Sequence, residues 1–315
     1  MSTILAMTTE SIANENQGNR NLYTAVLTSA IVAVLVIIKT IAYKQSGAVS
    51  ILTSLTDSLL DSCVSLMALG SIIYSQKPAD EDHRWGHGKI EAFSALIQAS
   101  IIVGGATFLV FESGIRLLEP RPIYQHWTGI TVMIGSIFLS VLLVVIQRRT
   151  LKNSQSLIVE SESIHYSSDV LINICTVVVL YANSHGAPIW LDSMFAICAA
   201  GIMVFMARSI FIKSLHVLLD RELPDADRDK IIAIIETHEG VLNWHDLRTR
   251  NHGELYDISF DIEVDKTLSL WDAHNITKDL ERDIIKLFDK CDVMIHVDPK
   301  GYTEDERHRV KGVHM

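Results

Sequence analysis

Six long apolar stretches fill the first two thirds of this 315-residue chain, and they constrain its fold more than any other feature. They cover residues 22–43, 49–75, 90–118, 127–146, 160–182 and 189–212. A helix needs roughly 20 apolar residues to cross the hydrocarbon core of a bilayer. Because lipid offers no hydrogen bonds to the backbone, such segments are expected to be helical. The sequence therefore predicts a six-helix transmembrane domain over residues 21–213, preceded by a polar tail at residues 1–20.

Lys and Arg gather on one side of the predicted membrane domain. The loops after the second and fourth stretches hold six of them: Lys77, Arg84, Lys89, Arg148, Arg149 and Lys152. The loops on the opposite side contain only Lys44 and Arg121. Because positively charged loops stay in the cytoplasm, both termini are expected there.

The remaining residues have the composition of a small water-soluble domain. Residues 225–238 and 271–288 have helical periodicity, and residues 245–250, 255–265 and 293–297 are predicted strands. The predicted order is α-β-β-α-β, an α+β cytoplasmic domain over residues 214–299 followed by a flexible tail at 300–315. The net charge of −10 argues against a nucleic-acid partner and favours cations.

Carboxylates and one imidazole interrupt two of the apolar stretches. Asp57 and Asp61 are four residues apart, as are His165 and Asp169, so each pair lies on one helix face. A charged side chain at the centre of a bilayer costs at least about 2.5 kcal/mol, which makes a purely structural reason hard to find. Together the four side chains suit tetrahedral Zn²⁺, and also Fe²⁺ or Cd²⁺.

The same four side chains also bind protons. A metal ion must displace protons from His165 and from any protonated carboxylate before it can bind. This competition is a physical basis for exchanging a metal ion for protons, and the proton gradient then favours export. The sequence thus predicts transport of a divalent metal cation, with Zn²⁺ first.

Two further groups have metal-ligand chemistry. Asp80, His83 and His87 have ligand-like spacing in the loop after the second stretch, although a solvated loop with local turn bonds is the alternative that the residues alone favour. In the cytoplasmic domain, His296 and Asp298 point the same way on a strand, and Asp261 lies on the polar side of another. A metal site forms there if the sheet aligns these faces.

Motifs along nearly the whole chain resemble the cation diffusion facilitator family, and its bacterial zinc and ferrous-iron efflux branch most closely. They occupy residues 54–61, 78–89, 165–173, 218–222, 245–250 and 295–299. The resemblance implies a homodimer in the bacterial inner membrane that exchanges a divalent metal for protons by alternating access. It also implies a metallochaperone-like fold for the cytoplasmic domain.

The resemblance assigns residues as well. Asp57, Asp61, His165 and Asp169 match the transport site, and Asp80, His83 and His87 match a loop site. In the cytoplasmic domain, the positions of a two-metal site at the dimer interface match His245, His274, His296 and Asp298. Lys89 and Asp220 match a charge pair that joins the protomers. Relatives usually have His where this chain has Asp261, so the cytoplasmic site is expected to be altered, weaker or reduced to one ion.

Two other classes of function remain open at this point. A membrane-bound metal sensor would read cytosolic metal through the soluble domain, but it needs no ligands inside the membrane. An intramembrane metalloenzyme needs an open coordination position for water, and the predicted set of four protein ligands leaves none. We therefore expect a transporter without catalytic activity or cofactor, in which the metal ion is substrate and also a structural or regulatory ion.

Overall fold

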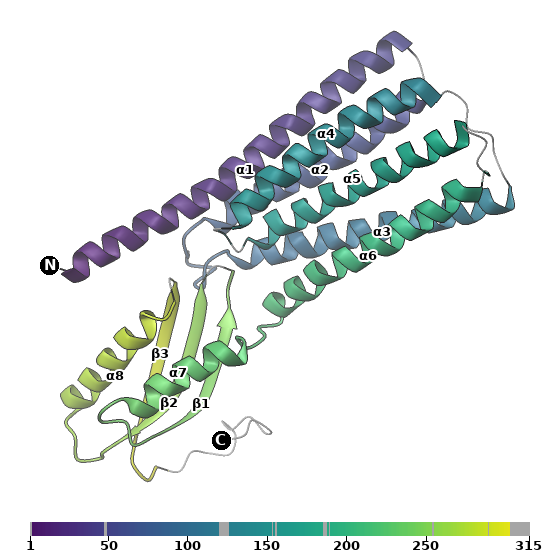
Figure 1. Ribbon diagram of the computed structural model, residues 1–315. Helices are drawn as coiled ribbons and strands as arrows, with labels where there is room; N and C mark the ends of the chain where they lie inside the picture. Colours follow the sequence, from purple (N-terminus) through teal and green to yellow (C-terminus); the bar gives the residue numbers. More distant parts are fainter. Residues whose placement is uncertain are drawn as a thin grey trace. The chain divides into compact units, whose positions relative to one another are not determined.

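The computed structural model describes residues 2–46, 49–119, 126–152, 154, 156–184, 188, 190–253, 255–288 and 290–302. The chain forms two compact units, Met1–Leu215 and His216–Met315. Long helices make up the first unit, and a small sheet with two helices makes up the second (Figure 1).

The first unit contains six long helices in the part of the chain that is described. They are α1 (Ser2–Ser46), α2 (Val49–Ser75), α3 (Lys89–Leu118), α4 (His126–Leu151), α5 (Leu157–Ser184) and α6 (Trp190–Leu218). Each contains one predicted apolar stretch. Helix α1 starts well before the predicted span, because residues 2–46 contain no proline and Gly18 as the only glycine. Nothing in that stretch ends a helix.

Four stretches of the described residues are long and apolar enough to cross a membrane. They are Gly18–Ile38, Ser58–Ser75, Lys89–Ile115 and Ser193–Leu218. Helix α5 differs in composition because Glu160, Glu162 and Asp169 interrupt its apolar sequence. Since acidic residues inside a membrane helix are costly and usually functional, α5 is where a site is expected.

Small side chains let the helices of the first unit approach closely. Five helices contribute to one fully buried group, which is named the Ile158 cluster: Ala25, Ala68, Ile72, Ala95, Ala99, Ile158, Val159 and Ile210. A second buried group joins α3 to α6 through Ile102, Ala106, Ala200, Met203 and Ala207. The two clusters place α3 against α5 and α6, as Figure 1 also shows.

The second unit has the predicted α-β-β-α-β order. Its elements are α7 (Asp225–Thr237), β1 (Asn243–Asn251), β2 (Tyr256–Val264), α8 (Leu270–Ile285) and β3 (Cys291–Pro299). The strands form one sheet in the order β1-β2-β3, with β1 antiparallel and β3 parallel to β2. The parallel pair requires a crossover, which α8 supplies. The fold class predicted from the sequence is confirmed.

Alternation along β2 separates a buried side of the sheet from a polar side. Ile258, Phe260, Ile262 and Val264 pack against Ile231 and Ile235 of α7 and Leu280 and Ile284 of α8. Asp257 shares the polar side of β2 with Asp261, yet it is only 9% exposed. The Arg250 Nε, 2.8 Å from Asp257 Oδ2, covers this carboxylate and pairs with it.

Candidate functional site

Helices α2 and α5 bring three of the predicted transport-site residues together. His165 Nε2 lies 3.1 Å from Asp61 Oδ1 and 3.9 Å from Asp169 Oδ2. One ligand atom of each residue lies within 4.8 Å of the others. Asp61 comes from α2, whereas His165 and Asp169 lie one turn apart on α5. The group is half-buried, with the His165 side chain 14% exposed.

These distances suit a tetrahedral metal ion. Ligand atoms bound to Zn²⁺ at about 2.0–2.1 Å lie about 3.3 Å from each other, and the two measured separations bracket that value. Two carboxylates and one imidazole offer oxygen and nitrogen donors without a thiolate. Such a set binds borderline divalent ions and leaves one tetrahedral position for a fourth ligand.

Asp57 is the predicted fourth ligand. It precedes Asp61 by one turn on α2, but its side chain lies outside the described part of the structure. The set of four ligands therefore stays a prediction at this position.

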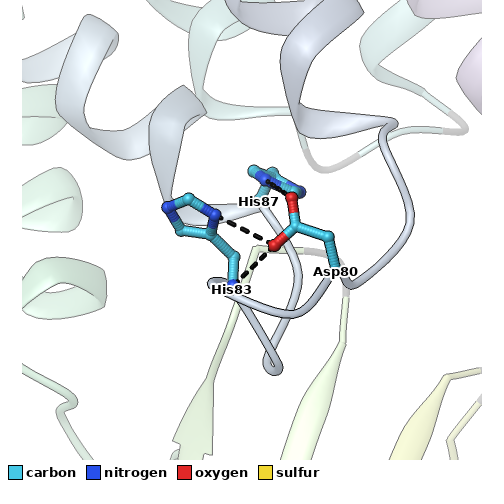
Figure 2. A group of neighbouring side chains, drawn as sticks. All are labelled: Asp80, His83 and His87. Carbon is cyan, nitrogen blue, oxygen red and sulfur yellow. Dashed lines mark hydrogen bonds and ion pairs between the residues drawn. The ribbon is translucent and has the colours of Figure 1, made fainter.

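The loop between α2 and α3 gathers all three of its predicted ligands (Figure 2). Asp80 Oδ1 lies 3.1 Å from His83 Nδ1, and Asp80 Oδ2 lies 3.3 Å from His87 Nε2. The His83 backbone N–H donates to Asp80 Oδ1 at 2.6 Å. That hydrogen bond, followed by the His83 and His87 rings, lowers the pKa of Asp80 and keeps it ionised.

His87 has a defined orientation in this loop. It is 6% exposed, and its Nδ1 lies 3.3 Å from the Lys77 carbonyl oxygen, which can only accept a hydrogen bond. Nδ1–H therefore donates to this carbonyl, and Nε2 faces the Asp80 carboxylate at 3.3 Å. A shared proton or a metal ion between Nε2 and the carboxylate would satisfy both groups. This arrangement suits a metal ligand held by a backbone hydrogen bond.

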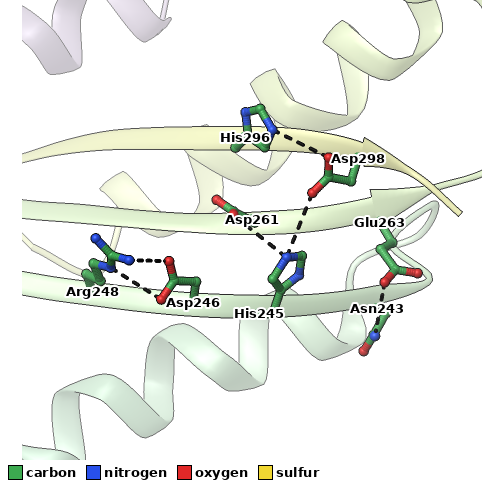
Figure 3. Close-up of polar contacts among 8 residues, drawn as sticks. All are labelled: Asn243, His245, Asp246, Arg248, Asp261, Glu263, His296 and Asp298. Atoms are coloured by element: carbon green, nitrogen blue, oxygen red, sulfur yellow. Dashed lines mark hydrogen bonds and ion pairs between the residues drawn. The ribbon is translucent and has the colours of Figure 1, made fainter. Parts of the chain in front are cut away.

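The polar side of the sheet forms the third group (Figure 3). His245 Nε2 of β1 lies 3.8 Å from Asp261 Oδ2 of β2 and 3.8 Å from Asp298 Oδ2 of β3. The register explains the gathering, because Asp261 pairs with His245 on one side and with His296 on the other. His296 Nε2 lies 3.4 Å from Asp298 Oδ1 and extends the group outward.

A bulge in β1 contributes to this geometry. The pairing with β2 shifts between His245 and Arg248, and Asp246 has a φ of 53°. The Arg248 guanidinium pairs with the Asp246 carboxylate (Figure 3). Bulges re-aim the side chains beside them, here that of His245.

The remaining predicted residues lie outside these groups. His274 is exposed on α8, where its ring neighbours Trp271, and it is absent from the group on the strands. Lys89 is the first residue of α3, and Asp220 follows α6 with a φ of 53° and its Oδ2 3.9 Å from Arg250 Nη1. The Lys89–Asp220 charge pair stays a prediction.

Sequence reasoning overlooked Glu162. It precedes His165 by three residues on α5 and is 1% exposed. The signal was present, since an ionisable residue in a membrane helix is by default a functional candidate.

Comparison with known proteins places the chain in a family. Residues 25–219 match the cation efflux transmembrane domain, and residues 223–300 match the cytoplasmic domain of cation efflux proteins. A cation-efflux pump FieF from Shewanella oneidensis is 39% identical over 265 residues, which is 84% of this chain and 89% of the relative. A FieF from Yersinia enterocolitica is 36% identical over 90% of this chain and 94% of its own length.

Among solved structures, the metal-bound C-terminal domain of the CzcD transporter from Thermotoga maritima is 40% identical. It covers 25% of this chain and 93% of that domain, with a TM-score of 0.24. The transmembrane family match covers more than half of the chain, and the FieF relatives match most of it. The chain therefore belongs to the cation efflux family, also called the cation diffusion facilitators, and is a membrane-spanning transporter that exports divalent metal cations.

Proposed function

We propose that this transporter exports Zn²⁺, and also Cd²⁺ or Fe²⁺, in exchange for protons by alternating access. The observation that carries the proposal is the meeting of Asp61, His165 and Asp169 between two helices of the membrane domain. Asp57 is proposed as the fourth ligand. A set of three carboxylates and one imidazole is borderline in softness, so it favours Zn²⁺ over Mn²⁺.

Proton coupling follows from the chemistry of the ligands. His165 Nε2 lies 3.1 Å from an oxygen of one carboxylate and 3.9 Å from an oxygen of another. A proton and a metal ion therefore compete for the same position among these three side chains. Binding of one displaces the other. Where protons are abundant the metal leaves, and where they are scarce it binds, so an inward proton gradient drives export.

The proposed setting is the inner membrane of a bacterium, with both termini in the cytoplasm. The loop after α2 contains Lys77 and Arg84, and the residues after α4 include Lys152, as expected for cytoplasmic loops. The second unit is proposed to hold regulatory metal through His245, Asp261 and Asp298 in a homodimer, with His274 and His296 completing the site. Asp80, His83 and His87 are proposed to bind cytosolic metal near the entrance.

The test is zinc flux into proteoliposomes across an imposed pH gradient. Flux should accelerate when the compartment that receives zinc is acidic, and reversing the gradient should slow it. Replacing Asp61 by Ala should abolish flux because the remaining proposed ligands no longer fill a tetrahedral site. Zinc flux that ignores the pH gradient would contradict the proton coupling, and flux that survives Asp61→Ala would contradict the site.

A further inference from the structure

Helix α5 has another acidic side chain on the same face as the Asp61–His165–Asp169 group. Glu162 precedes His165 by three residues and Asp169 by seven, so all three side chains line one face. With a rise of about 1.5 Å per residue, Glu162 lies about 4.5 Å from His165 along the axis, toward the N-terminal end of α5. Glu162 is adjacent to this group along α5 but is not one of its three gathered ligands.

The environment of Glu162 is unusual for a carboxylate. It is 1% exposed, and within the described residues neither of its side-chain oxygens has a hydrogen-bond partner within 3.5 Å. Other acidic residues nearby are satisfied: Glu91 accepts hydrogen bonds from Ser75 and Ser156, and Glu160 pairs with Lys213 at 2.7 Å. A buried carboxylate without a partner is costly, and packing alone would be served better by an uncharged side chain.

Along α5, Glu162 lies between the Asp61–His165–Asp169 group and the apolar Ile158 cluster. Ser65, one turn after Asp61 on α2, neighbours Glu162, and its hydroxyl lies 2.9 Å from that of Ser29. Asp61 with His165 thus form one level, and Ser65 with Glu162 form the next, toward the start of α5. One turn further, Ile158 and Val159 belong to the fully buried Ile158 cluster. The unpartnered carboxylate points to a cation that visits this level.

We propose that Glu162 is a further cation-binding residue of the transport route, which the metal ion contacts on its way between the N-terminal side of α5 and the Asp61–His165–Asp169 group. The inference rests on the proposed function. One carboxylate and one hydroxyl are too few ligands to hold Zn²⁺ firmly, as a transit position requires. Once the approaching metal ion displaces any proton from this carboxyl group, the carboxylate stabilises the ion at this position and lowers the barrier for entry and for exit.

The experiment measures how fast Zn²⁺ reaches the main group in the full-length protein. Stopped-flow mixing with a fluorescent zinc chelator follows association and dissociation, and the phase that Asp61→Ala removes belongs to this group. Glu162→Gln should slow both rates by at least about tenfold, and the dissociation constant should change by less than either rate. A residue that served only to carry a proton would alter the pH dependence of flux and leave these two rates as they are.

Two further variants separate charge from packing. Glu162→Asp keeps the carboxylate but shortens the side chain, whereas Glu162→Gln keeps the size but removes the charge. Zinc association and dissociation should therefore be faster in Glu162→Asp than in Glu162→Gln. A packing role predicts the opposite order. Glu160→Gln makes the same chemical change two residues earlier and should leave both rates unchanged, because Glu160 is already paired with Lys213. Should Glu162→Gln fail to fold, Glu162→Met is neutral and of similar length and makes the same comparison.

The outcomes distinguish this inference from the proposed function. A wild-type protein that moves no zinc contradicts the proposed function. Zinc flux in the wild type together with wild-type association rates in Glu162→Gln contradicts only the role of Glu162.

Discussion

At the scale of single residues, the choice of metal depends on one imidazole between two carboxylates. His165 is the only nitrogen donor in the gathered group, and its Nε2 points at Asp61 Oδ1. Replacing His165 by Asp makes every ligand a hard oxygen, so preference should move from Zn²⁺ and Cd²⁺ toward Mn²⁺ and Fe²⁺. We expect the ratio of zinc to manganese flux to fall by about tenfold, equivalent to about 1.4 kcal/mol.

The control makes the same exchange away from the site. His216, near the end of α6, contacts Arg221 and belongs to none of the three groups. His216→Asp should therefore leave the ranking of Zn²⁺, Cd²⁺, Fe²⁺ and Mn²⁺ intact in a flux assay. Unchanged ranking in His165→Asp as well would show that ligand softness does not set the selectivity.

At the scale of elements, the bulge in β1 sets the direction of His245. Asp246 adopts a left-handed backbone conformation there, which Asp tolerates and β-branched residues do not. Asp246→Val should destabilise the sheet by about 1–2 kcal/mol relative to Asp246→Gly. Both variants lose the pair with Arg248, so their difference isolates the backbone.

Hydrogen exchange of the β1 and β2 amides in the full-length protein measures this local stability. Exchange in the valine variant should be faster than in the glycine variant by about tenfold. Zinc binding by His245, Asp261 and Asp298 should weaken in parallel, because the bulge no longer presents His245 to the other strands. Equal exchange in both variants would mean that the bulge is not held by the conformation of Asp246.

Elements were predictable from the sequence to the extent that their signals are local. The apolar stretches locate the membrane helices, and alternation along 255–265 locates β2 and its buried face. Whether Asp61 meets His165 depends on how α2 packs against α5. The spacing along each helix predicts only that Asp57 lies near Asp61 and His165 near Asp169. The burial of Asp257 on the polar side of β2 could not be predicted, because it depends on Arg250 from another strand. The bulge was missed for a similar reason, since it exists only in the pairing of β1 with β2.

At the scale of the whole molecule, groups that could hold a metal ion occur in both units of the chain. The first unit holds the Asp61–His165–Asp169 group and the Asp80–His83–His87 loop, and the second unit holds the group on the strands. Each contains carboxylate and imidazole and none contains thiolate, so all three offer donors suited to the same class of ion.

The proposed homodimer leads to a prediction about Lys89, the first residue of α3. If Lys89 pairs with Asp220 between protomers, Lys89→Glu replaces attraction by repulsion at two symmetric places. With about 1 kcal/mol for each exposed pair, the dimer should weaken by about 2 kcal/mol, or about thirtyfold in its dissociation constant. Lys152→Glu makes the same charge change in another loop and should leave the dimer intact. Light scattering of the detergent-solubilised protein over a dilution series measures both, and equal dimer affinity in the two variants would remove Lys89 from the interface.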